Sequence, residues 1–250
     1  MKVPPSIMRK AGEAVVEYKM ISGGDRILIG LSGGKDSFVL AHVLYELQKK
    51  APVRFDLVCA TFDPGFKGFE LEKIRSYALS QNWEFHSVKL DIAPIIEEKD
   101  FEESPCALCS RLRRGHLYRL MDELNCNKLA LGHHADDAII SFVMSYFRGH
   151  GLSTMGPNVP AQNDKRIIRP LILTAEERIA EFANALSLPV YGQCKYKKHL
   201  DINGDRAFFR QIIAQIEEKI PDFRSLALKS MGKIEQNYLF DKKFIDFLQN

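Results

Sequence analysis

The chain has 250 residues, of which 46% are hydrophobic and 27% charged, and its formal net charge is +3. This length and apolar content are enough to bury one domain core with an appendage. No apolar stretch is long enough for a membrane span, and the start of the chain lacks the apolar centre of a signal peptide. We therefore expect a cytoplasmic protein with no membrane partner.

Strand-length and helix-length apolar patterns alternate along the chain, as in a doubly wound α/β protein. The expected helices cover about residues 6–21, 38–50, 69–81, 109–124, 136–147, 174–186 and the tail 206–250. The expected strands cover residues 26–31, 53–62, 83–90, 128–132 and 166–171. A polar loop is expected at 149–164, and Thr174 begins a capping-box pattern for the helix that follows it.

These elements predict a mostly parallel five-stranded sheet with helical additions at both ends. We divide the chain into an N-terminal helix (1–22), an α/β domain (23–191) and a cysteine-containing basic loop with a helical tail (192–250). The apolar leading helix and the tail could also supply a homodimer surface.

The strongest chemical signal is a glycine-rich turn between the first predicted strand and the next helix. It consists of Ser32, Gly33, Gly34, Lys35, Asp36 and Ser37. Two glycines let the backbone approach a pyrophosphate, the hydroxyls add donors, and Lys35 and the helix N-terminus favour negative charge. The spacing differs from that of Walker A. The turn predicts a phosphate site, and it resembles the signature of the PP-loop family, which binds ATP.

A second loop reads Gly-His-His-Ala-Asp-Asp from Gly132 to Asp137 and follows a short buried strand. In an open parallel sheet the carboxyl ends of the strands border the ligand crevice, so this loop and the glycine-rich turn are expected to face one site. His133 would contact phosphate, and Asp136 and Asp137 would organise Mg²⁺ or orient the helix. Simple capping of the helix by the two carboxylates is the alternative.

Cys106 and Cys109 form a C-x-x-C pair in a chain with five cysteines. In a cytosolic chain such a pair favours a metal or redox site over a structural disulfide. The spacing does not choose between zinc and an iron–sulfur cluster, and either needs further ligands. Cys194 lies in a polar loop suited to ligation, whereas Cys59 lies in an apolar strand and is expected in the core.

The order of these motifs resembles the TtcA family of tRNA 2-thiocytidine synthetases, which have the adenine nucleotide alpha hydrolase-like PP-loop fold. The matching segments are residues 32–37, 106–109, 132–137, 167–171 and Cys194. The resemblance implies an ATP-dependent enzyme that adenylates C2 of cytidine 32 in tRNA and replaces its oxygen with sulfur. It also implies Mg²⁺, an oxygen-sensitive 4Fe-4S cluster, and a cysteine desulfurase or another sulfur donor as partner.

The resemblance assigns roles to individual residues. The cluster ligands would be Cys106, Cys109 and Cys194, although the family usually has a second cysteine where this chain has Lys197. The catalytic residues would be Lys35, Asp36, Asp63 and Asp137. ATP contacts would come from residues 32–37, Thr61, Phe62, Gly132, His133 and Asp136. For Asp63, which precedes Pro-Gly, initiation of a turn is nearly as well supported.

Basic residues cluster beside the cysteines of both segments. Alone, each cluster is typical of a solvated face. With the resemblance they predict a track for tRNA phosphates while a splayed-out base enters the site. The track would consist of Arg111, Arg113, Arg114, Lys195, Lys197, Lys198, Arg206 and Arg210.

Other functions stay open at this point. Related enzymes thiolate uridine, and nothing in the sequence distinguishes cytidine from uridine or one tRNA position from another. A zinc-bearing or cluster-free PP-loop ligase and a nonenzymatic iron–sulfur redox protein are further alternatives. A pure RNA-binding module is disfavoured, because no stacking pattern of aromatic residues is visible.

Overall fold

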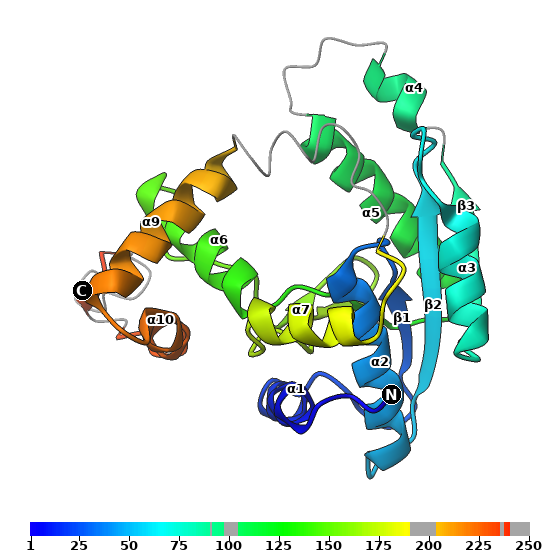
Figure 1. The fold of residues 1–250 in the computed structure, drawn as a ribbon, viewed down its shortest axis with the longest axis horizontal. Coiled ribbons are helices and arrows are strands. Elements are labelled where there is room, and N and C mark those ends of the chain that lie inside the picture. The colour runs from blue at the N-terminus through cyan, green and yellow to red at the C-terminus, as the bar shows by residue number, and fades with distance from the viewer. Residues whose placement is uncertain (91, 98–104, 191–203, 236–237, 241–250) are drawn as a thin grey trace, which may run out of the picture.

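The computed structural model describes residues 1–90, 92–97, 105–190, 204–235 and 238–240 (Figure 1). Within these residues six strands form one sheet, in the order β3-β2-β1-β4-β6-β5. They are β1 (Arg26–Gly30), β2 (Asp56–Asp63), β3 (Phe85–Lys89), β4 (Lys128–Ala130), β5 (Asn158–Pro160) and β6 (Arg166–Ile168). The order grows outward from β1 in both directions, which is the doubly wound arrangement.

The five strands expected from the sequence are all present and pair in parallel. The sixth strand, β5, lies in the segment expected to be a loop, and it pairs antiparallel with β6 at the edge of the sheet. Three residues are too few for an alternating pattern to show, and Pro160 argues against a strand. The mostly parallel α/β class is confirmed, with β5 as an added edge strand.

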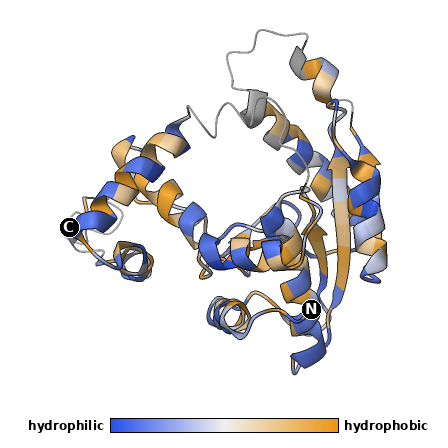
Figure 2. Cartoon of the chain, in the orientation of Figure 1, coloured by the Kyte–Doolittle hydropathy of each residue, from blue (hydrophilic) through white to orange (hydrophobic). Residues whose placement is uncertain are grey.

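The two faces of the sheet carry separate hydrophobic clusters, because side chains alternate along each strand. On β1, Ile27 and Ile29 belong to one cluster and Leu28 to the other. On β2, Leu57 and Val58 divide in the same way. Strands buried on both faces read as continuous apolar runs, and Figure 2 shows the apolar colour along β1 and β2.

Helices cover both faces of the sheet. They are α1 (Pro5–Glu17), α2 (Lys35–Lys50), α3 (Leu71–Ser80), α4 (Ile92–Glu97), α5 (Pro105–Glu123), α6 (Ala135–Phe147), α7 (Glu176–Ala185), α9 (Asp205–Lys219) and α10 (Phe223–Met231). The first cluster includes α1, α2, α3 and α7, and the second includes α4 and α5. Among the helices of the described residues, none combines the length and apolarity needed to cross a membrane.

The helical tail packs on α6 instead of on the sheet. Ile139, Ile140 and Val143 of α6 form a third cluster with Phe209 and Ile213 of α9, and α10 adds half-buried residues to it. In Figure 1, α9 and α10 lie beyond α6, on the side away from β2 and β3. The predicted C-terminal helical addition is therefore confirmed, and its described residues include α9 and α10.

The start of α7 differs from the prediction. Thr174 does not cap this helix, because the N-cap is Ala175 and the buried Thr174 hydroxyl has no hydrogen-bond partner. Instead the Glu176 N–H donates to Asp136 Oδ2 on α6, at 2.7 Å. A cap supplied by a distant helix leaves no local sequence pattern, which is why the capping-box prediction is wrong.

A buried ion pair ties the amino end of β4 to the residue before β1. Lys128 Nζ lies 2.5 Å from Asp25 Oδ2 and donates to the Met20 carbonyl oxygen at 2.9 Å. Asp25 also accepts hydrogen bonds from the Ser22 N–H (2.6 Å) and the Asn127 side chain (2.8 Å). Both charged side chains are less than a tenth exposed. Removing either one would leave the other charge buried and uncompensated.

We expect Asp25→Ala to lower the free energy of unfolding by about 3–5 kcal/mol, the usual cost of breaking a buried pair. The matched control is Glu13→Ala, which removes an exposed pair with Lys10 and should leave stability nearly unchanged. Chemical denaturation of both variants measures the difference. A loss below about 1 kcal/mol for Asp25→Ala would mean that the pair does not secure these strands.

Candidate nucleotide site

The glycine-rich turn and the loop after β4 touch one another. They leave the carboxyl ends of two adjacent strands, β1 and β4. A Cβ atom at Gly132 would lie 2.9 Å from the carbonyl carbon and oxygen of Asp36 and 3.0 Å from the Ser37 nitrogen. The two backbones are thus so close that position 132 has room only for glycine.

Hydrogen bonds inside the glycine-rich turn hold its shape. The Ser37 hydroxyl accepts a bond from the Ser32 N–H (3.1 Å) and donates to the Gly34 carbonyl oxygen (2.8 Å). Gly33 has a φ of +83°, a conformation that L side chains rarely adopt. The Ser37 hydroxyl and this glycine therefore support the geometry of the turn, whatever they contact besides.

The turn leads directly into α2, whose first N–H groups have no partner inside the helix. Together with the helix dipole they attract an anion. Asp36 Oδ1 is buried and lies 3.1 Å from the Lys35 ammonium, so a metal cation bound to this oxygen would lie beside that charge. Within the described ranges no three His, Cys, Asp or Glu side chains converge, so a Mg²⁺ ion here would need phosphate oxygens as well.

Glu176, at the start of α7, reaches the glycine-rich turn. Its Oε1 lies 2.9 Å from Lys35 Nζ. Burial favours the neutral form of both groups, but their hydrogen bond and opposite charges prevail, so the pKa of Lys35 is raised and the pKa of Glu176 is lowered. The nearby charge of Asp36 also raises the pKa of Lys35, and that of Arg210 also lowers the pKa of Glu176. Sequence reasoning placed Glu176 in a capping pattern only and missed this contact.

His133 is held by Arg169, which follows β6. The Arg169 Nε–H donates to His133 Nδ1 at 3.1 Å. Burial, with the charge of Arg169, lowers the pKa of His133 to about 4. The ring is therefore neutral at pH 7 and carries its proton on Nε2, where it can act as a donor. Arg169 lies in the segment 167–171, but the sequence suggested no role for it.

The two carboxylates at the start of α6 are both engaged. Asp137 Oδ2 accepts a bond from the His134 N–H (3.3 Å), and Asp137 Oδ1 lies 3.1 Å from Arg206 Nη1 on α9. Asp136 caps α7 and pairs with Arg224 of α10. These contacts match the capping alternative and extend it to neighbouring helices. A role of either carboxylate in holding Mg²⁺ stays a prediction.

Three further predicted residues lie at the carboxyl end of β2. Thr61 and Phe62 are buried, and the Thr61 hydroxyl donates to the Leu31 carbonyl oxygen (2.5 Å), directly before the turn. Their predicted ATP contacts would thus come from the backbone. Asp63 Oδ1 accepts a bond from the Gly65 N–H (2.9 Å), as in a turn initiated by aspartate. A catalytic role of Asp63 stays a prediction.

Cys106 and Cys109 lie three positions apart in the first turns of α5. Cys109 is half-buried. The side chain of Cys106 and the whole of Cys194 lie outside the described residues. Cys59 and Cys126 are buried, and burial raises the pKa of both thiols, that of Cys126 to about 11. Their thiolate forms are disfavoured, so neither is suited to ligate a metal.

The predicted RNA-binding residues fall into two groups. Arg111 is exposed and Arg113 half-buried on α5, Arg210 is exposed on α9, and Arg206 pairs with Asp137. Outside the described part lie the side chain of Arg114 and the residues Lys195, Lys197 and Lys198. The track that joins the two basic clusters stays a prediction.

Gly132→Ala should separate the glycine-rich turn from the loop after β4, because the atoms that crowd the new Cβ belong to the backbone. We expect unfolding free energy to fall by about 1–3 kcal/mol and ATP affinity to fall with it. Gly12→Ala is the control, since nothing lies within 4 Å of a Cβ in the middle of α1. Denaturation and calorimetry measure both effects, and unchanged ATP affinity in folded Gly132→Ala would separate this contact from nucleotide binding.

Comparisons with known proteins agree with this geometry. A model of the PP-loop domain matches residues 5–215. The tRNA-cytidine(32) 2-sulfurtransferase of Syntrophotalea carbinolica is 35% identical over 243 residues, which cover 96% of this chain and 93% of the relative. The protein of the same name from Pelobacter propionicus is 38% identical over 235 residues, or 93% of this chain and 87% of the relative.

A solved structure is also similar. The U34-tRNA thiolase NcsA from Methanococcus maripaludis, with its 4Fe-4S cluster, matches with a TM-score of 0.72 at 23% identity, over 92% of this chain and 79% of that chain. This likeness shows a common fold. From the family model and the sequence relatives together, the chain belongs to the PP-loop domain family and, within it, to the family of tRNA-cytidine(32) 2-sulfurtransferases.

Proposed function

We propose that this protein is an ATP-dependent tRNA sulfurtransferase that replaces the C2 oxygen of a cytidine, at tRNA position 32, with sulfur. The observation that carries the proposal is the junction of the glycine-rich turn with the loop after β4 at Gly132, in a chain whose relatives of that name match over nearly their full length. The choice of cytidine over uridine rests on those relatives.

In the first step the cytidine O2 attacks the α-phosphorus of ATP, the bond to the bridging oxygen of the β-phosphate breaks, and pyrophosphate leaves. The N–H groups at the start of α2 and the Lys35 ammonium offset the charge that collects on the leaving group. His133 adds a neutral donor through Nε2. Mg²⁺, if Asp36 Oδ1 holds it, would neutralise further phosphate charge. A hydrosulfide-level sulfur, which a persulfide donor would supply only together with a two-electron reductant, then adds at C2 and loses its proton, and the bond from C2 to the former base oxygen breaks as AMP leaves with that oxygen.

The residues that would hold an iron–sulfur cluster are Cys106, Cys109 and Cys194. Two cysteines three positions apart in the first turns of α5 fit a cluster edge, and Cys59 and Cys126 are buried with disfavoured thiolates. When bound, the cluster would supply the sulfur-carrying chemistry of the second step. A cysteine desulfurase or another donor would deliver that sulfur to the enzyme.

Lys35→Ala should slow tRNA-dependent pyrophosphate release by about a hundredfold or more, because a preorganised charge at the phosphates is lost. The fold should persist, since Lys35 is partly exposed and contacts carboxylates, not the core. Lys10→Ala is the matched control, because Lys10 pairs with Glu13 on the exposed side of α1. Undiminished turnover in Lys35→Ala would remove the glycine-rich turn from the reaction.

Anaerobically purified Cys106→Ala, Cys109→Ala and Cys194→Ala should each contain less iron and sulfide than the wild type, since each loses one thiolate ligand. Cys59→Ala is the control, because that thiol is buried in the first hydrophobic cluster and has a raised pKa. Elemental analysis and visible absorption measure the content. Equal iron in all four variants would refute the ligand assignment without touching the ATP site.

A further inference from the structure

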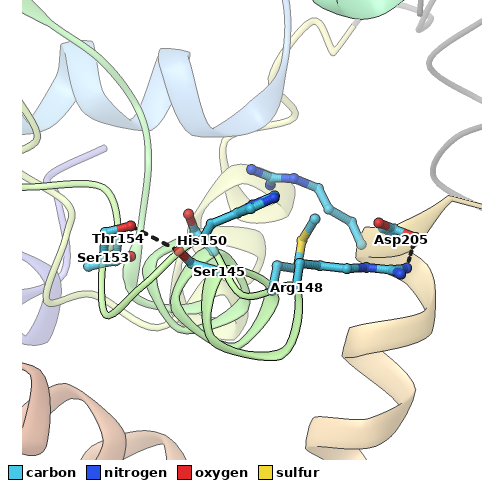
Figure 3. A pocket seen from close by; sticks show the side chains of 9 residues that line it. Ser145, Arg148, His150, Ser153, Thr154 and Asp205 are labelled. Carbon is cyan, nitrogen blue, oxygen red and sulfur yellow. Dashed lines mark hydrogen bonds and ion pairs between the residues drawn. The ribbon is translucent and has the colours of Figure 1, made fainter. Parts of the chain in front are cut away.

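A pocket of about 360 Å³ lies between the second half of α6, the loop after it and the start of α9. It is distinct from the glycine-rich turn, and among its lining residues the sequence analysis assigned a role only to Arg206. Figure 3 shows Arg148 at the end of α6 reaching across to Asp205 of α9, while Ser153 and Thr154 lie at the opposite end of the pocket. Its volume suits a group the size of one nucleotide.

Hydrogen bonds preform the wall of this pocket. The Ser145 hydroxyl donates to the Gly151 carbonyl oxygen (3.0 Å) and lies 2.9 Å from the Ser153 hydroxyl. The Thr154 hydroxyl donates to the Ala138 carbonyl oxygen at 2.6 Å. The loop is thereby fastened back along α6, so a ligand would find the wall already in place.

The lining is basic. Its side chains include Arg148, Arg206 and His150, and one carboxylate, Asp205. Arg148 Nη2 lies 2.7 Å from Asp205 Oδ1, and Arg206 Nη1 pairs with Asp137 at the start of α6. Each of these pairs engages one nitrogen of a guanidinium that has several N–H donors, so the fork geometry leaves directions from which a phosphate can be bound.

Exposed aromatic rings adjoin the basic lining. Phe147 and Phe208 are 61% and 55% exposed, and both pack on the buried ring of Phe209, with centroid distances of 5.9 and 5.1 Å. The Arg148 guanidinium lies 6.0 Å from the centre of the same Phe209 ring. Tyr146 adds a third exposed ring. Exposed rings beside guanidinium groups are typical of sites for unpaired nucleotides.

The pocket is also placed for a long substrate. At about 1.5 Å per residue along the helix, Ser141 lies about 9 Å and Arg148 about 20 Å from the start of α6 at the nucleotide site. A group in the pocket is therefore too far away to react at the glycine-rich turn. Such a group can belong to a neighbouring part of a substrate whose reacting base lies at the glycine-rich turn.

We propose that this pocket binds an unpaired nucleotide of the substrate RNA next to the one that is modified, with its phosphate on Arg148 and Arg206 and its base on the ring of Phe208. The inference rests on the proposed RNA-modifying function and adds a site for the substrate. The positive lining favours this occupant over a second copy of the chain, which would bring the same basic side chains to the contact.

The test compares the affinity of variants for an unmodified tRNA transcript at several salt concentrations. Phe208→Leu should bind about tenfold more weakly with an unchanged salt dependence, because it loses stacking but no charge, and Phe208→Tyr should restore binding. Arg148→Ala should bind more weakly and flatten the slope of log affinity against log salt by about one. Controls are Tyr238→Leu, at another exposed ring, and Arg178→Ala, at another exposed Arg–carboxylate pair.

Each outcome decides the inference. Wild-type affinity in Phe208→Leu and Arg148→Ala, with thiolation by the wild type intact, would overturn the pocket and leave the proposed function standing. A wild type that neither binds nor thiolates tRNA would overturn both. If the variants change the oligomeric state in light scattering instead of RNA affinity, the surface is a contact between copies. Wild-type affinity in Phe208→Tyr together with weaker binding in Phe208→Leu supports stacking on this ring. Thermal melting of all variants confirms that the fold is retained.

Discussion

The buried carboxylate of Asp136 joins the elements on which the site depends. It is 7% exposed, and burial of such a charge is tolerated only where donors surround it. The donors come from two other helices: the Glu176 N–H at the start of α7 and the Arg224 guanidinium of α10. Because the carboxylate of Asp136 binds donors from both helices, α6, α7 and α10 are fixed relative to one another. Helix α7 thereby presents Glu176 to Lys35.

Helix α6 links two regions of different chemistry. The loop that leads into its amino end lies against the glycine-rich turn at Gly132, where the two backbones are closely packed. Its carboxyl end carries the exposed rings of Tyr146 and Phe147, followed by Arg148, at the pocket that we propose for an unpaired nucleotide. Arg206 contacts the carboxylate of Asp137 near the first end while it lines the pocket at the second. A rigid helix would keep a fixed distance between the site of the reacting group and the site that binds a neighbouring part of the substrate.

What the sequence predicted and what it missed differ in the range of the interactions involved. The strand, glycine-rich turn and helix around Lys35 depend on local apolar patterns and on glycine geometry, and these are readable residue by residue. The partners Glu176 and Arg169 lie 141 and 36 residues along the chain from Lys35 and His133, so their charge gave no local signal. The three-residue strand β5 was missed for want of length. The aromatic group at Phe209 is assembled from two helices far apart in the chain, which is why no stacking pattern appeared.

The pair between Lys35 and Glu176 changes the meaning of affinity at the glycine-rich turn. An anion that binds the Lys35 ammonium competes with a carboxylate of the same chain for that charge, so its binding is not a simple association with a free lysine. The measured free energy of binding is then the intrinsic value reduced by that of the internal pair. The internal pair thereby lowers the ground-state affinity of an anion for Lys35, and the Glu176 carboxylate stays within reach to re-form the pair once the anion has left.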